Sequence, residues 1–219
     1  MPLTINETEA RVLGSLVEKQ LTTPEYYPLT LNALTAACNQ KSNRDPVMSL
    51  GETEILAAID SLRDKNLVYL YYGSSSRTVK YKHMLPNVFE IEAPAVAILT
   101  LLLLRGPQTA GEMRGRADRL YEFSGIGEVQ ETLDELARRD DALVVKLERQ
   151  PGQKESRYAH LLSGPVDAAA VTASAESTYA ASPTASGGRI EQLEQQVEKL
   201  SSEMAELRSM FEEFRKQFE

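Results

Sequence analysis

The sequence predicts a mostly helical α+β fold that is duplicated within the chain and followed by a long terminal helix. Three observations in the 219 residues lead to this prediction. Stretches with the apolar period of a helix precede a pair of β-rich stretches. The same order of elements recurs roughly 75 residues later. The last thirty residues carry an unbroken heptad pattern.

Three helices are expected in the first part of the chain. Asn6, with Glu9 three residues later, predicts a capped start, and a second helix is expected near Thr30. Ser49 and Glu52 form a capping-box pattern before a third helix. The buried face of that helix is predicted to consist of Ile55, Leu56, Ile59 and Leu62.

A β-hairpin is predicted after these helices. LVYLYY (67–72) and TVKYKHML (78–85) flank the turn-forming GSSSR. Alternation along the second strand places Lys80 and Lys82 on one face, with Val79 and Tyr81 on the other.

The second part repeats this order. Pro94 and Gly106 bound a helix, and Thr109 with Glu112 predicts the capped start of a short one. A third helix carries Val129, Leu133 and Leu136, and ALVVKLE (142–148) with SRYAHLL (156–162) predicts another hairpin. Residues 80–85 align with 157–162, 77 positions later. Three helices and a hairpin describe a winged helix-turn-helix unit, so we predict two tandem domains, 1–90 and 91–163.

The end of the chain is predicted to differ from both domains. Residues 164–188 are rich in Ala, Ser, Thr and Gly and predict a flexible linker. Residues 189–219 predict a coiled-coil helix that makes the protein a homodimer, although the apolar stripe has the alternative of folding back on its own chain. The a and d positions of its heptads are Ile190, Leu193, Val197, Leu200, Met204, Leu207, Phe211, Phe214 and Phe218.

Composition and charge indicate which classes of protein the chain can belong to. The net charge is −8, and residues 166–219 contribute 10 Asp/Glu against 5 Lys/Arg. The body of the chain is therefore nearly neutral and generates no global basic field. A single cysteine fits a reducing compartment, and the longest apolar run, Ala95 to Leu104, is too short to span a bilayer. We expect a cytoplasmic protein without a membrane partner.

Catalytic residues are not apparent in the sequence. The only histidines, His83 and His160, occupy matched positions in the two hairpins, which favours a structural role. Cys38 lies on the apolar side of a helix and is expected to be a buried, inert thiol. We therefore predict a non-enzymatic protein with no cofactor and no metal site.

A binding role remains, and the winged-helix prediction favours double-stranded DNA. However, the third helices are acidic, with Glu52 and Glu54 in one and Glu128 and Glu131 in the other, and phosphates would repel them. A protein partner that contacts these acidic helices is the competing interpretation. The candidate nucleic-acid-binding residues are Lys41, Arg44, Arg77, Lys80, Lys82, Lys154 and Arg157.

The segment NQKSNRDP (39–46), which joins two predicted helices, allows two interpretations. Arg44 either fixes the angle between the helices by pairing with Asp45, Glu52 or Glu54, or it joins Lys41 in contacting phosphate or an acidic partner.

Three stretches of the chain resemble the YceH family of bacterial proteins. They are EARVLGSLVEKQLTTPEYYPLTLN (9–32), NQKSNRDP (39–46) and RGPQTAGEMRGRADRLYEF (105–123). The resemblance extends over about residues 4 to 162. It implies two tandem winged-helix domains, and it implies no activity and no site residue.

Overall fold

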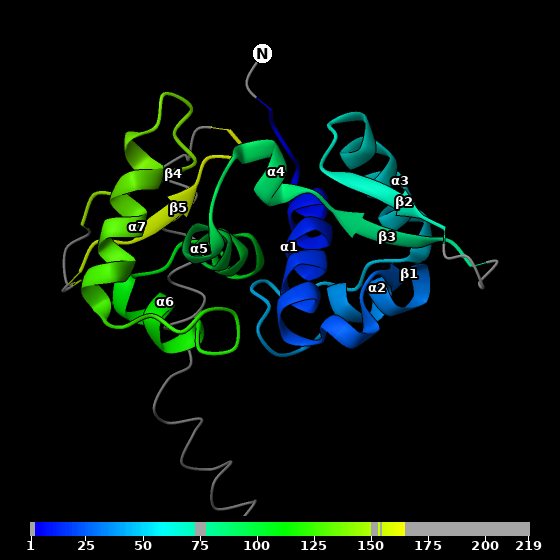
Figure 1. Cartoon of the computed structure of the whole chain (residues 1–219), viewed down its shortest axis with the longest axis horizontal. Helices are drawn as coiled ribbons and strands as arrows, with labels where there is room; N and C mark the ends of the chain where they lie inside the picture. Colours follow the sequence, from blue (N-terminus) through cyan, green and yellow to red (C-terminus); the bar gives the residue numbers. More distant parts are fainter. Residues whose placement is uncertain (1–2, 73–77, 150–152, 154, 165–219) are drawn as a thin grey trace, which may run out of the picture. The chain divides into compact units, whose positions relative to one another are not determined.

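The computed structural model describes residues 3–72, 78–149, 153 and 155–164. They belong to one compact unit, Met1–Asp167. Apart from Gly164, the predicted linker and the predicted coiled coil lie outside the described residues. The described part is an α+β structure with small antiparallel sheets (Figure 1).

The first half contains the three predicted helices and a three-stranded antiparallel sheet of order β1-β3-β2. Strand β3 is central, because β1 and β2 pair with its two edges. The elements are α1 (Glu7–Thr22), the 3-10 helix η1 (Pro24–Tyr26), β1 (Leu29–Thr30), α2 (Leu31–Cys38), α3 (Glu52–Asp64), β2 (Val68–Tyr71) and β3 (Lys80–His83).

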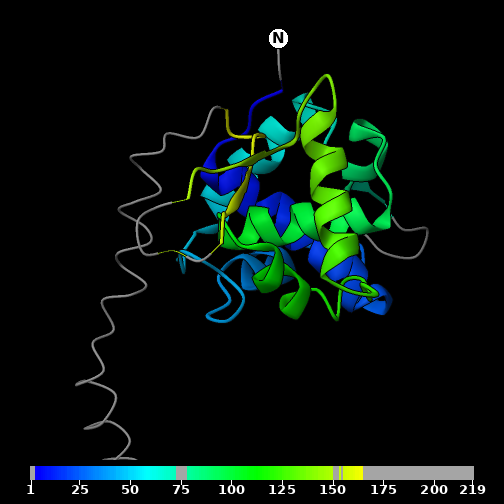
Figure 2. The ribbon, with the colours of Figure 1, turned by 90° about the vertical axis from the view of Figure 1, so that its left-hand side faces the viewer.

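The second half repeats this order after the short helix α4 (Leu85–Phe89). A bridge between Gln108 and Tyr158 occupies the place that β1 and β3 occupy in the first half. Helix α7 crosses α5, as Figure 2 shows from the side of the second half. The elements are α5 (Ala93–Arg105), α6 (Ala110–Arg116), α7 (Ile126–Arg138), β4 (Val144–Lys146) and β5 (Tyr158–His160).

Backbone hydrogen bonds match the internal repeat that the sequence predicts. The amide of Leu67 donates to the carbonyl of Leu62 at 2.9 Å, and Leu143 donates to Leu136 at 3.0 Å. The amide of Met84 donates to the carbonyl of Leu67, as Leu161 does to Leu143. The two halves therefore join the third helix to the hairpin in the same way.

Two predicted helix starts are confirmed. In α1, the amide of Glu9 donates to Oδ1 of Asn6 at 2.9 Å, and the Asn6 amide donates to Glu9 Oε2 at 3.0 Å. Thr109 and Glu112 form the same reciprocal pair at α6, at 2.9 and 3.1 Å. Each pair satisfies backbone donors that a helix N-terminus would otherwise leave unbonded.

The predicted start and buried face of the third helix need correction. Gly51, not Ser49, precedes α3, and its amide donates to Oε2 of Glu54 at 2.8 Å. Leu56 is 38% exposed, because the buried positions follow the i, i+3, i+4, i+7 spacing that leaves it outside. These buried positions are Ile55, Ala58, Ile59 and Leu62.

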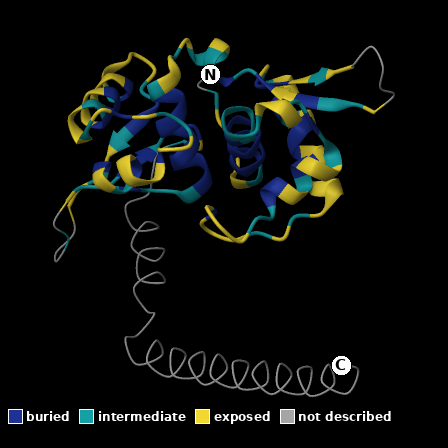
Figure 3. Cartoon of the chain, turned by 60° about the horizontal axis from the view of Figure 1, so that its bottom comes forward, coloured by how far each residue is buried: buried dark blue, intermediate teal, exposed yellow. Residues whose placement is uncertain are grey.

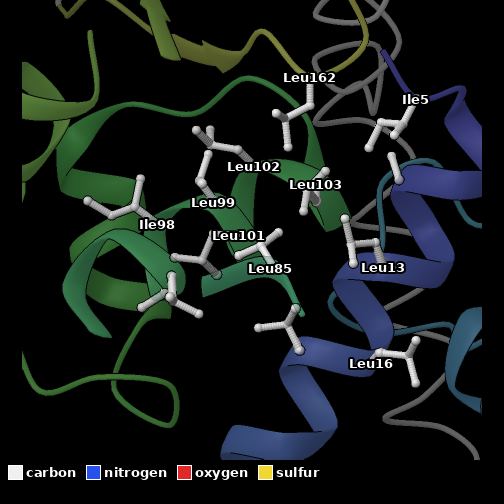
Figure 4. Packing of buried hydrophobic residues seen from close by; sticks show 14 of the residues in the cluster. Ile5, Leu13, Leu16, Leu85, Ile98, Leu99, Leu101, Leu102, Leu103 and Leu162 are labelled. Atoms are coloured by element: carbon white, nitrogen blue, oxygen red, sulfur yellow. The ribbon is translucent and has the colours of Figure 1, made fainter. Parts of the chain in front are cut away.

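The core is shared between the two halves. Helix α1 packs against α5, whose residues Ala95 to Leu104 are all buried. Figure 4 shows Leu13 of α1 beside Leu103 of α5. Figure 3, coloured by burial, shows buried residues on the inner elements of both halves. The boundary predicted at residue 90 lies between α4 and α5, and the buried cluster extends across it.

Candidate functional site

The outward face of the three-stranded sheet carries alternating tyrosines and lysines. In β2, Val68 is buried while Tyr69 and Tyr71 are 49% and 47% exposed. In β3, Tyr81 and His83 are buried, whereas Lys82 is exposed and Lys80 is half-buried. This confirms that the two lysines share one strand face. We call Tyr69, Tyr71, Lys80, Lys82 and Thr30 the Tyr–Lys face.

Strand register sets the tyrosines beside the lysines. Tyr69 pairs with Lys82, and Tyr71 pairs with Lys80, which is also paired with Thr30 on its other side. Side chains directly opposite in an antiparallel sheet have Cβ atoms about 4.5–5.5 Å apart. Each tyrosine is therefore the direct cross-strand neighbour of a lysine. In the described part of the chain, the ion pairs include neither lysine.

This arrangement suits a ligand in which flat aromatic rings are joined by phosphate groups. Exposed tyrosine rings offer π-faces on which unpaired bases stack, and lysines neutralise the backbone between them. The hydroxyl of Tyr69 donates to Oδ1 of Asn66 at 3.3 Å, which restricts that ring. Tyr72, which follows β2, is 68% exposed.

The two histidines lie on the hairpin strands β3 and β5. Burial, with the nearby charge of Lys82, lowers the pKa of His83 to about 4. Its neutral ring accepts a hydrogen bond at Nδ1 from the Leu85 amide at 3.3 Å, and its own amide donates to the Tyr27 hydroxyl oxygen at 2.7 Å. Burial likewise lowers the pKa of His160 to about 4.

Cys38 is fully buried, as the sequence predicts. Burial raises the pKa of its thiol to about 11, so the reactive thiolate is scarce at neutral pH. Within the residues that the structure describes, no group of three or more His, Cys, Asp or Glu side chains is placed to hold a metal ion.

Arg44 does not lie on the candidate surface. Its side chain is 0% exposed and forms a bidentate pair with Glu18, at 2.6 and 3.0 Å. It also donates to the carbonyl of Ala37 through Nε at 3.1 Å and Nη2 at 2.9 Å. The predicted pairing of Arg44 with Asp45, Glu52 or Glu54 is therefore wrong, because its guanidinium binds the carboxylate of Glu18 on α1.

Other contacts also tie the 39–46 segment to the helices around it. Arg11 of α1 is buried and donates to the carbonyls of Cys38 and Pro46. Asn39 pairs through its side chain with both backbone groups of Leu50, at 2.7 and 2.8 Å. This segment fixes α1, α2 and the start of α3, which favours the structural interpretation of Arg44.

The remaining candidate cations are dispersed. Arg157 donates to the carbonyl of Pro107 at 2.8 Å and pairs with Glu112 at 3.1 Å, so its charge is used internally. Lys41 is exposed on the 39–46 segment. Arg77 and Lys154 lie outside the described residues. Of the seven predicted residues, the structure brings together Lys80 and Lys82.

Tyr69 and Tyr71 are the site residues that the sequence analysis missed. Their signal was present in LVYLYY, where buried Val68 and half-buried Leu70 alternate with the two exposed rings. The same period-two argument that paired Lys80 with Lys82 would have found them.

The exposed faces of the third helices are acidic, as predicted. Glu52, Glu54 and Asp60 are exposed on α3 around Leu56. On α7, the exposed side chains are Ile126, Gln130, Glu131, Asp134, Glu135 and Arg138. Each helix has one exposed arginine, Arg63 or Arg138, and each pairs with an aspartate of its own helix. Carboxylates therefore outnumber cations on both helices, which is unfavourable for a major-groove contact.

Comparison with known proteins identifies the family. Residues 5–153 match the family described as "Protein of unknown function, DUF480". The chain belongs to the DUF480 family. This confirms the YceH resemblance, and the DUF480 match includes the whole Tyr–Lys face.

Its bacterial relatives are similar over most of their length. A UPF0502 protein of Citrifermentans bemidjiense is 52% identical over 197 residues, which cover 90% of each chain. One from Koribacter versatilis is 53% identical with the same coverage. One from Shewanella halifaxensis is 47% identical, covering 86% of this chain and 91% of its own.

Proposed function

We propose that this DUF480 protein is a non-enzymatic module of two winged-helix units that binds single-stranded nucleic acid through the Tyr–Lys face. The observation that carries the proposal is the cross-strand alternation of exposed Tyr69 and Tyr71 with Lys82 and Lys80. Aromatic rings interleaved with cations are the usual platform for single strands.

The order of elements supports the winged-helix assignment. Helix, short strand, two helices and hairpin is the order of α1, β1, α2, α3 and β2–β3. Winged helices commonly insert the third helix into the major groove of a duplex. The carboxylates of α3 oppose that contact, because phosphates repel them. The sheet face is the alternative, and it requires bases that are already unpaired.

The first prediction concerns stacking. Tyr69→Ala and Tyr71→Ala should each weaken binding of a labelled single DNA strand about 5- to 150-fold, because one stacked base contributes about 1–3 kcal/mol. Fluorescence polarisation of the full chain measures the dissociation constant. Tyr69→Phe and Tyr71→Phe keep the ring and should retain binding.

Leu56→Ala is the matched control for stacking, because Leu56 is an exposed apolar residue on α3 rather than on the sheet. Its affinity for the strand should equal that of the unsubstituted protein. Unchanged affinity in both Tyr→Ala variants, or no binding of single strands at all, would contradict the proposed function.

The second prediction concerns salt. Each phosphate contact with a single strand contributes about −0.7 to the slope of log K against log salt concentration. Lys80→Gln and Lys82→Gln should therefore each make the slope shallower by about 0.7. Arg138→Gln, which removes an exposed cation on α7, should leave the slope unchanged. Equal slopes in all variants would show that the lysines do not contact the backbone.

A protein partner is the competing function, and a specific observation favours it. Leu56 on α3 and Ile126 on α7 are exposed and lie among carboxylates. An apolar centre with an acidic rim fits a basic protein surface. A pull-down with and without nuclease, read by mass spectrometry, separates the two functions, because nuclease removes partners that are held through nucleic acid.

Two chains per particle would double the binding surface. The heptad pattern of residues 189–219, which lie outside the described residues, supports a parallel homodimer. A cytoplasmic dimer would then bind one strand through two Tyr–Lys faces with added avidity. For the described residues, no helix combines the length and apolar character needed to cross a membrane.

A further inference from the structure

A cleft of about 450 Å³ lies on the underside of the compact unit, away from the Tyr–Lys face. Its walls come from the C-terminal ends of α1 and α5, from the 39–46 segment, and from α6 with the residues that follow it. Figure 1 places the ends of α1 and α6 at the lower edge, and Figure 3 turns this side forward. We call it the basic cleft.

Positive charge exceeds negative charge in the basic cleft. Four cations line it, against two carboxylates, Glu18 and Asp118. Glu18 pairs with buried Arg44 at 2.6 Å and with Lys19 at 3.5 Å, so its charge is compensated within the protein. The four cations are Lys19, Arg105, Arg116 and Arg119.

Arg105 and Arg116 are held in the cleft with their charges close to each other. Burial lowers the pKa of Arg105, and the charge of Arg116 lowers it further. Arg105 is oriented by a hydrogen bond from Nη1 to Oδ1 of Asn43 at 2.9 Å. An anion between two such guanidinium groups would relieve their repulsion.

Arg116 is held in place by a hydrogen bond to a buried side chain. Its Nη1 donates to Oε1 of Gln108 at 2.7 Å, and Gln108 is buried. Nε2 of Gln108 in turn donates to the carbonyl of Leu101 at 2.9 Å. The nearest carboxylate, Glu112, is 3.6 Å from Arg116 and is also paired with Arg157 at 3.1 Å. Arg116 is therefore positioned in advance and only partly neutralised.

Arg119 provides donors that no described residue accepts. Within the described part of the chain, no hydrogen bond or ion pair occupies its guanidinium, although it lines the cleft. A guanidinium has five N–H donors in a planar fork that matches two oxygens of a phosphate or carboxylate. The wall beside it carries Leu101, Leu104 and Leu120, which would contact an organic body.

We propose that the basic cleft binds the phosphate group of a small phosphorylated metabolite, with Arg105, Arg116 and Arg119 as its ligands. The volume lies within the about 300–1,000 Å³ range of small-molecule sites. The polar side chains at the rim, Thr22, Gln40 and Ser42, suit the hydroxyls of such a compound. Each of the three stretches that carry the family resemblance contributes side chains to this cleft.

The test titrates the full chain with glycerol 3-phosphate and, separately, with inorganic phosphate by isothermal calorimetry at constant ionic strength. Saturable binding of both probes is expected. Arg119→Gln should weaken it roughly tenfold or more, because it removes charge-assisted hydrogen bonds. The variant should keep the melting temperature of the parent, since Arg119 has no partner to lose among the described residues.

Controls separate this site from the Tyr–Lys face. Arg138→Gln removes an exposed arginine of α7 and should bind glycerol 3-phosphate as the parent does. Tyr69→Ala should also retain it, whatever happens to nucleic-acid binding. Absence of saturable binding, or equal affinity in Arg119→Gln, overturns the proposal. Displacement of glycerol 3-phosphate by a single DNA strand would overturn it too, because the cleft would then take backbone phosphates.

Discussion

Replacing Arg44 by alanine should lower the free energy of unfolding by about 3–5 kcal/mol, the usual loss when one partner of a buried ion pair is removed. The guanidinium is 0% exposed and Glu18 is 11% exposed, so water compensates little of the lost contact. The carbonyl of Ala37 also loses both of its donors from Arg44. Denaturant unfolding at neutral pH, followed by circular dichroism, measures the change.

The loss should shrink in acid. Burial alone would raise the pKa of Glu18, but the hydrogen bonds and charge of Arg44 outweigh it and hold that pKa below its usual value of 4.5. The stability from this pair is therefore present above pH 4.5 and is lost as pH falls through the lower, folded-state pKa. In Arg44→Ala, Glu18 retains only the more distant Lys19 at 3.5 Å and binds a proton more readily. Acid therefore destabilises the variant less than it destabilises the parent.

Two control variants show whether the loss of stability in Arg44→Ala comes from the buried ion pair. Arg138→Ala breaks an exposed pair with Asp134 and should change stability by less than about 1 kcal/mol. Arg44→Lys keeps the charge but loses the bidentate geometry, so it should fall between Arg44→Ala and the parent. A loss for Arg44→Ala as small as that for Arg138→Ala would show that the pair does not stabilise the fold.

Local signals in the sequence predicted the elements well. The capping pairs of α1 and α6, the stop at Gly106 and both hairpins depend on neighbouring residues, which a single sequence displays. The start of α3 was misplaced because Glu54 serves the cap as well as Glu52 would. Periodicity therefore predicts element type better than it predicts element ends.

The partners of the charged residues could not be predicted in the same way. Arg44 was expected to pair with carboxylates near it in sequence, but Glu18 lies 26 positions away on α1. Arg157 similarly finds Glu112, 45 positions away. Sequence spacing identifies neighbours only within one element, and these contacts arise when separate elements pack. The basic cleft has the same origin, because its four cations come from three separate parts of the chain.

The second large effect on stability is expected at Gly14, where α1 meets α5. A Cβ at this position would lie 2.9 Å from Leu104 Cγ, closer than Cβ atoms pack, and 3.1 Å from Leu103 Cβ, tighter than most Cβ contacts. Overpacking of this kind costs about 1–3 kcal/mol, whereas alanine recovers up to about 1 kcal/mol of helix propensity. Gly14→Ala should therefore lose stability, and the larger Gly14→Val should lose more, about 3 kcal/mol.

Gly127→Ala is the control, because the same substitution should here change the free energy of unfolding in the opposite direction. Gly127 lies in α7, and a Cβ there meets nothing within 4 Å. Only the gain in helix propensity remains, so stability should stay equal or rise by up to about 1 kcal/mol. Because α1 belongs to the first half and α5 to the second, Gly14→Val should shift a single unfolding transition that reports on both halves. If Gly14→Val left one half melting at the parental temperature, the two halves would not depend on their shared core.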